Sequence, residues 1–382
     1  MPRPPKVDPT VAEMPAAVFS KLAAKISSYQ GELFPLHVGD TWMEPFVGGR
    51  MQDLSVLSHP GMHRYASTQG LSPLIDAVLE KVRIRNHLPA EKSSILISAG
   101  ATGALSSAIG ALVKPGEEVL ILAPFWPLIR GIVSSFRAQP VEVPFYGQVA
   151  SLEEAIEAIE SRIGPNTVAL YVSSPSNPTG IVIPDEWLMG IAELARKHNL
   201  WIFSDEVYEE MVFEGTHSSI GRHCPERSLT SFSFSKTYGM AGNRTGYLVG
   251  PSDVVAQCRK ISTHTFYSAP TSGQIAALQA LRQGGEWVSA ARMSYRESGY
   301  RAADVLGLPR PAGGTFLFFD VAAVLDERGV FGFLEDCLED GLLLAPGSSF
   351  GRGFESYVRL CFTSAPPERV DAAVRLLAQR LA

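Results

Sequence analysis

Short apolar runs and longer amphipathic segments alternate along most of the chain. The runs predict strands at residues 94–98, 118–123, 141–144, 167–173, 200–203, 229–234 and 246–250. Apolar residues spaced three and four apart predict amphipathic helices at residues 72–85, 151–163 and 185–198. This alternation of strands and helices is typical of an α/β protein.

The pattern changes after about residue 281. A long helix is predicted at residues 286–305, and a strand, a helix and two further strands follow it at 314–320, 329–340, 342–345 and 357–362. At the other end of the chain, a proline-rich arm leads into a helix at 11–27 and a short strand that runs into a loop at 36–45. A chain of 382 residues is long enough for two domains.

Composition narrows the class of protein. The hydrophobic content of 46% and charged content of 19% are those of an ordinary globular protein. A net charge of −6 argues against a nucleic-acid or anionic-membrane binder, and the longest uncharged stretch, residues 93–113, is too rich in small residues for a membrane span. Four scattered cysteines and an N-terminus without the apolar core of a signal peptide predict a cytoplasmic protein.

The segment 231–247 holds the densest group of candidate chemical residues. A lone lysine at the end of a strand is usually a solvated surface residue, but Lys236 lies between Ser233 and Arg244, whose hydroxyl and guanidinium suit a phosphate dianion. Glycines in the same segment permit close backbone approach. An amine beside a phosphate site suggests a lysine bonded covalently to a phosphorylated aldehyde cofactor.

Two further positions favour ligand binding at strand ends. A small-residue turn at 99–104 joins a predicted strand to a helix that ends at about residue 113, and a helix N-terminus attracts anions. Asp205 follows a predicted strand, at the edge where an α/β sheet usually binds ligands, although a helix cap would also explain it.

Taken together, these segments resemble the class I and II aminotransferases, the fold type I enzymes that use pyridoxal 5′-phosphate (PLP). Ser233, Ser235, Lys236, Arg244 and the residues up to Tyr247 match the family's Schiff-base signature. Residues 177–180 match its Asn-Pro-Thr-Gly motif, and residues 346–351 match its Pro-Gly-x-x-Phe-Gly turn. The order and spacing of these motifs also agree with the family.

The resemblance implies a role for each matching residue around PLP. Lys236 is the Schiff-base lysine, and Asp205 and Tyr208 complete the catalytic set. The phosphate is bound by Gly100, Ala101, Thr102, Ser233 and Arg244. The ring is contacted by Trp126, Asn177, Asp205 and Tyr208.

The resemblance also implies a substrate site and a dimer. The substrate carboxylate is expected to meet Arg359, Asn177 and Gly39. The loop after Gly39 reads Asp-Thr-Trp where the family more often has Glu-Pro, so the choice of substrate stays open. Tyr65 corresponds to a tyrosine that reaches the cofactor of the partner subunit, which implies a homodimer with shared active sites.

The implied fold is a large PLP-binding domain over residues 46–285, with a mostly parallel, seven-stranded type of sheet. Residues 1–45 and 286–382 would form the N-terminal arm and a small α/β domain. The implied reaction is transfer of an amino group between an L-amino acid and a 2-oxo acid through Lys236. Elimination, replacement or cyclisation on the same cofactor would use the same residues and remains the alternative.

Two other motifs, one typical of hydrolases and one of metal sites, are excluded by the positions of the histidines. Residues 347–351 match the Gly-x-Ser-x-Gly turn of hydrolases, but no histidine follows His264 to serve as the base. His59 and His63 are separated by Pro60-Gly61, which would break a helix that could bring them to one metal.

Overall fold

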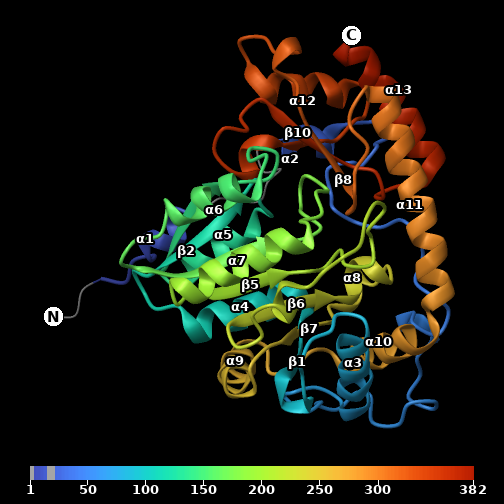
Figure 1. Cartoon of the computed structure of the whole chain (residues 1–382). Coiled ribbons are helices and arrows are strands. Elements are labelled where there is room, and N and C mark those ends of the chain that lie inside the picture. Colours follow the sequence, from blue (N-terminus) through green and yellow to red (C-terminus); the bar gives the residue numbers. More distant parts are fainter. Residues whose placement is uncertain (1–3, 15–21) are drawn as a thin grey trace.

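The computed structural model describes residues 4–14 and 22–382. Its centre is a seven-stranded sheet with the order β1-β7-β6-β5-β4-β2-β3 (Figure 1). Only β7 runs antiparallel to its neighbours, so the predicted mostly parallel sheet is confirmed. The strands are β1 (Ile95–Ser98), β2 (Glu118–Ala123), β3 (Gln139–Pro144), β4 (Thr167–Ser173), β5 (Trp201–Asp205), β6 (Ser228–Ser233) and β7 (Gly246–Val249).

Helices cover both faces of this sheet because its strands carry apolar side chains on both sides. Ile121 and Phe203 pack with α4 (Gly100–Leu112), α5 (Leu128–Ser135) and α9 (Ser252–Thr265). Leu120 and Ile202 point the other way and pack with α6 (Leu152–Glu160) and α7 (Asp185–Lys197). Near β1 and β7, α3 (Ser72–Ile84) and α10 (Thr271–Gln283) share a further apolar cluster.

A second, smaller sheet lies in the upper part of Figure 1. It is antiparallel, with the order β8-β10-β9, and consists of β8 (Phe316–Asp320), β9 (Ala345–Pro346) and β10 (Tyr357–Cys361). Its apolar core includes side chains of α11 (Gly285–Leu306), α12 (Gly329–Glu339) and α13 (Pro367–Leu381). The boundaries at residues 46 and 285 between two domains stay a prediction.

The N-terminal segment joins the small sheet's core. Phe34 bridges to Leu342, and both belong to the same apolar cluster. Residues 36–45 form no strand, and the strand predicted at 342–345 begins only at Ala345. Of the helix predicted at 11–27, residues 15–21 lie outside the described residues; α1 (Pro9–Ala12) and α2 (Ala23–Ser28) lie on either side.

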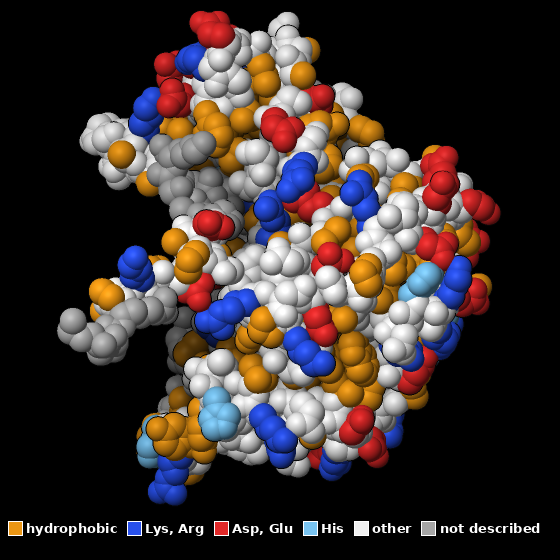
Figure 2. All heavy atoms as spheres, turned by 90° about the vertical axis from the view of Figure 1, so that its left-hand side faces the viewer, with side chains coloured by type: hydrophobic (Ala, Val, Ile, Leu, Met, Phe, Trp, Pro, Cys, Tyr) orange, Lys and Arg blue, Asp and Glu red, His pale blue; other side chains and the backbone are white. Residues whose placement is uncertain are grey.

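The surface agrees with the modest net charge. Figure 2 shows one face, on which basic, acidic and apolar side chains are interspersed. Within residues 4–14 and 22–382, none of the helices has the length and apolar character needed to cross a membrane.

Candidate active site

A cavity of about 390 Å³ opens where the carboxyl ends of the central strands face the small sheet. The paired residues Ser173, Asp205 and Ser231 bring the ends of β4, β5 and β6 side by side. The cavity is lined by most of the predicted site residues: Gly39, Ala101, Thr102, Trp126, Asn177, Asp205, Tyr208, Ser233, Lys236, Arg244 and Arg359. Residues far apart in the sequence therefore meet at one place.

Lys236 lies on α8 (Phe234–Thr237), a single turn directly after β6. Ser233 caps this turn, its hydroxyl oxygen accepting a hydrogen bond of 3.0 Å from the backbone N–H of Ser235. The Lys236 ammonium donates to the carbonyl of Gly39, and its Nζ lies 3.8 Å from Asp40 Oδ1. Burial lowers the pKa of Lys236, which favours the neutral amine.

Asp205 presents one free carboxylate oxygen in a buried position. Its Oδ2 accepts a hydrogen bond of 2.7 Å from the Tyr171 hydroxyl, whereas Oδ1 is buried and has no hydrogen-bond partner among the described residues. Burial raises the pKa of Asp205 to about 6. A cationic N–H at Oδ1 would both satisfy this oxygen and stabilise the ionised carboxylate.

The guanidinium of Arg244 packs against the backbone at the start of α4. Arg244 has a left-handed backbone (φ +51°), and its guanidinium donates to the carbonyl of Ala241 at 2.8 Å and to that of Ala99 at 3.4 Å. Gly100, with φ +71°, leaves room for this guanidinium, because a Cβ there would lie 2.6 Å from Arg244 Nη2. Gly100 itself does not line the cavity, but Ala101 and Thr102 do.

Arg359 is a buried cation on β10. Its guanidinium donates to Asn177 Oδ1 at 3.0 Å and to the His37 carbonyl at 2.7 Å, and it lies 4.2 Å from the Phe316 ring centroid. Burial lowers the pKa of Arg359. Gly39 lies close to the same ring, since a Cβ there would be 2.7 Å from Phe316.

Tyr65 is the one predicted site residue that lies well apart from the cavity within this chain. Its side chain is 86% exposed, and its ring centroid is 4.9 Å from that of Tyr267. The predicted contact with a partner subunit's cofactor therefore stays a prediction.

The sequence assigns no role in the site to His37 and Ser235, which line the cavity, or to Tyr171, which donates to Asp205. A tyrosine in the middle of an almost completely buried strand is itself a signal, because its hydroxyl needs a buried acceptor. Burial also lowers the pKa of His37 to about 4, so its imidazole is neutral.

Comparison with known proteins supports the assignment to this family. The family model for aminotransferase class I and II matches residues 42–377. The chain is 32% identical to a probable aspartate/prephenate aminotransferase of Thermus aquaticus, over 84% of each chain, and 30% identical to an arginine–pyruvate transaminase of Pseudomonas aeruginosa, over 86% of this chain and 85% of that one.

Solved structures give the same result. The aspartate aminotransferase of Thermus thermophilus with maleate superposes with a TM-score of 0.88 and 29% identity, covering 98% of this chain and 100% of that one. The N-succinyldiaminopimelate aminotransferase of Mycobacterium tuberculosis has a TM-score of 0.88 and 26% identity, covering 99% of this chain and 100% of that one. These relatives support transamination and not the elimination or cyclisation alternative. The chain therefore belongs to the class I and II aminotransferases, a family that depends on PLP, and it transfers an amino group between an amino acid and a 2-oxo acid.

Proposed function

We propose that the cavity binds PLP and that Lys236 carries it. The observation that supports this most strongly is the free, buried Oδ1 of Asp205, in the same cavity as the buried amine of Lys236. A protonated ring nitrogen of PLP is the cation that this oxygen lacks. Ser233, Arg244 and the N-terminus of α4 line the same cavity and supply donors that suit a phosphate dianion.

The remaining residues suit the ring. Trp126 would lie against its face, and Tyr208 and Asn177 would donate to its phenolic oxygen. Asn177 uses its Oδ1 to accept from Arg359, which leaves its amide N–H groups for such an acceptor. When bound, PLP supplies an electron-withdrawing ring that makes the Cα proton of an attached amino acid acidic.

Lys236 and Arg359 have different roles toward the substrate: Lys236 transfers a proton and Arg359 binds the carboxylate. The lowered pKa of Lys236 lets its amine accept the Cα proton and return it at a second carbon. Arg359 has neutral oxygens as its two hydrogen-bond acceptors, so its buried charge attracts the substrate carboxylate. A carboxylate held there fixes the orientation of the Cα–H bond relative to Lys236.

Four other lining residues give the cavity an apolar wall: Val38, Pro127, Leu128 and Phe350. The basic residues Lys236, Arg244 and Arg359 already have roles with the cofactor and the substrate carboxylate. We therefore expect donors with apolar or aromatic side chains to be preferred over aspartate.

A homodimer is the proposed assembly. Leu57 is 95% exposed, and Val47, Met51, Val56 and Tyr65 are also exposed, which is unusual for so many large apolar side chains in one segment. A second copy that covers this segment would bring Tyr65 close to the partner's cavity. We also propose a reducing, cytoplasmic location, because all four cysteines are free and buried.

The absorbance spectrum of the purified protein tests the proposed function. PLP bound to Lys236 gives a visible band that bleaches when a donor amino acid is added and a 2-oxo acid forms. Lys236→Ala is expected to lose this response and turnover. A wild-type protein that shows no band after incubation with PLP would refute the proposal.

Mixing two inactive variants tests the shared site. In a mixed dimer of Lys236→Ala and Tyr65→Ala subunits, both defects fall in one site and the other site keeps both native residues, so about a quarter of all sites are intact after random subunit exchange. Recovery of activity on mixing is expected. No recovery, or a monomer in light scattering, would contradict the dimer.

A further inference from the structure

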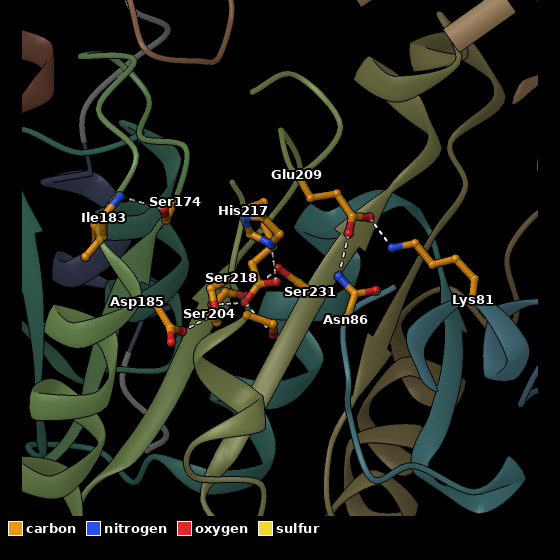
Figure 3. Close-up of polar contacts among 12 residues, drawn as sticks. Lys81, Asn86, Ser174, Ile183, Asp185, Ser204, Glu209, His217, Ser218 and Ser231 are labelled. Atoms are coloured by element: carbon orange, nitrogen blue, oxygen red, sulfur yellow. Dashed lines mark hydrogen bonds and ion pairs between the residues drawn. The ribbon is translucent and has the colours of Figure 1, made fainter. Parts of the chain in front are cut away.

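A buried polar group lies behind Asp205, on the side of β5 away from the cavity. The carboxylate of Glu206, the next residue, is only 1% exposed. It accepts hydrogen bonds from Ser204 Oγ at 2.8 Å, Ser219 Oγ at 2.9 Å and His217 Nε2 at 3.0 Å. Figure 3 shows the side chains of Ser204 and His217 directed at the same point. None of these residues lines the active-site cavity.

Charge balance within this group depends on His217. The two serine hydroxyls are neutral, so His217, with 11% of its side chain exposed, is the only direct partner within residues 4–14 and 22–382 that can carry a positive charge. Lys81 lies nearby but forms its own buried pair with Glu209, which also accepts from Asn86 at 2.7 Å (Figure 3). A buried carboxylate without a cation is costly, and this favours an imidazolium at His217, although its Nδ1 is buried with no hydrogen-bond partner among the described residues.

The pKa of His217 agrees with this geometry. Burial alone lowers it, but the hydrogen bond and charge of Glu206 and the charge of Glu209 raise it above the usual value for histidine, against a smaller opposing effect of Lys81. Glu206 in turn adds to the raised pKa of Asp205. The positive charge of His217 therefore offsets the negative charge of Glu206. Without it, Glu206 would raise the pKa of Asp205 further.

The same group also fixes the backbone at the end of β5. The Glu206 N–H donates to the Ser231 carbonyl at 3.0 Å, and the Ser231 hydroxyl donates to the Ser204 carbonyl at 3.1 Å. Ser218, beside His217, donates to Asp185 at the start of α7, so the loop that carries His217 is itself anchored (Figure 3). Ser204 and Asp205 are successive residues of β5 and point to opposite faces, so the hydrogen bond from Ser204 to Glu206 holds this group on one face and directs Asp205 into the cavity on the other.

We propose that His217 and Glu206 are positioning residues, an ion pair that holds Asp205 toward the cavity and keeps it ionised against the ring nitrogen of PLP. This inference rests on the proposed function, because it gives Asp205 a cationic partner. Neither residue touches substrate or cofactor; both act through Asp205.

Two variants separate charge from packing. His217→Gln keeps an N–H donor for Glu206 but removes the positive charge, so Glu206 becomes an uncompensated anion beside Asp205. We expect kcat and PLP affinity to fall about tenfold and KM to change little, because Arg359 is untouched. The double variant His217→Gln/Glu206→Gln removes both charges and is expected to restore most of the loss.

A matched control is available on another surface. His198 Nε2 lies 2.7 Å from Glu160 Oε1 and does not line the cavity, so His198→Gln removes a histidine–carboxylate pair that is more exposed and whose carboxylate also pairs with Lys197. It is expected to leave kcat and PLP affinity unchanged. Wild-type values in His217→Gln, or a double variant worse than the single one, would overturn the proposal.

A measurement on the wild-type protein remains informative if the variants do not fold. With ¹⁵N-labelled histidine, the ring nitrogens of a protonated imidazole are distinguished from those of a neutral one by NMR. We expect one buried imidazole to be protonated at pH 7 in the cofactor-free protein; eight neutral imidazoles would refute the ion pair. Because this readout needs no PLP, it is independent of the absorbance test, whose failure would reject the proposed function instead.

Discussion

The burial of Asp205 predicts a cost in stability that depends on pH. In the cofactor-free protein its carboxyl group has a pKa of about 6, against 3.8 as the ordinary value. The folded state therefore holds the proton over a range in which the unfolded chain has already released it. Stability from this group is complete below pH 3.8, is lost as the pH rises to about 6, and stays lost above that.

The size of the effect follows from the two pKa values. A rise from 3.8 to about 6 corresponds to about 3 kcal/mol at high pH, of which about half is lost between pH 5 and pH 8. Asp205→Asn removes the ionisation but keeps the shape. We therefore expect the variant to gain about 1.4 kcal/mol in the free energy of unfolding relative to wild type between these two pH values.

Urea unfolding followed by tryptophan fluorescence, at matched protein concentration and without PLP, measures this difference. An unpaired amide at residue 205 also lowers the free energy of unfolding of the variant by an amount that does not depend on pH. The test is therefore how the difference in free energy of unfolding between variant and wild type changes with pH, and not its value at one pH. With saturating PLP the order is expected to reverse, because only the carboxylate pairs with a protonated ring nitrogen. Parallel pH curves for the two cofactor-free proteins would refute this account of Asp205.

Four other expectations can be checked separately. Tyr171→Phe removes the donor to Asp205 Oδ2, so the pKa of Asp205, read from the same unfolding curves, should rise further; an unchanged midpoint would contradict this. Arg359→Leu should lower kcat/KM for amino acids about 100-fold, with Arg359→Lys intermediate, while an equal loss for an amine without a carboxylate would argue against carboxylate binding. Gly100→Ala should weaken PLP binding at least about tenfold, whereas Gly242→Ala, where a Cβ meets nothing within 4 Å, should not. In a panel of donors, a higher kcat/KM for aspartate than for phenylalanine or leucine would contradict the proposed apolar wall.

Much of the large sheet follows from local pattern. Each of β1 to β7 overlaps a predicted strand, because most of these strands are short apolar runs and β6 alternates apolar with hydroxyl side chains. The helix α9 is not predicted: Val254, Val255 and Ile261 are β-branched, and its helical state depends on packing against α4 and the sheet. A helix at residues 128–135 is also not predicted, since Gly131 interrupts a short segment.

The site residues also fall into two groups, those that local sequence motifs identify and those that only the folded structure reveals. Lys236, Asn177 and Asp205 lie in contiguous motifs, so their identity and order are visible in the sequence. The position of Tyr171 in a buried strand hints at a buried acceptor, but neither its partner nor that of His217 is visible, because no local spacing encodes a contact with a residue on another segment. The small sheet is predicted less well because β9 is only two residues long and Leu342 pairs with Phe34 instead.

The close packing of Arg244 against Gly100 has a consequence for how this sequence can diverge. Any side chain at residue 100 displaces the guanidinium of Arg244, so as long as residue 244 remains arginine, residue 100 is confined to glycine. The converse does not hold: loss of Arg244 would not free residue 100, because its φ of +71° strains any other side chain there. A descendant sequence could therefore exchange Arg244 for another cation only while it keeps glycine at residue 100.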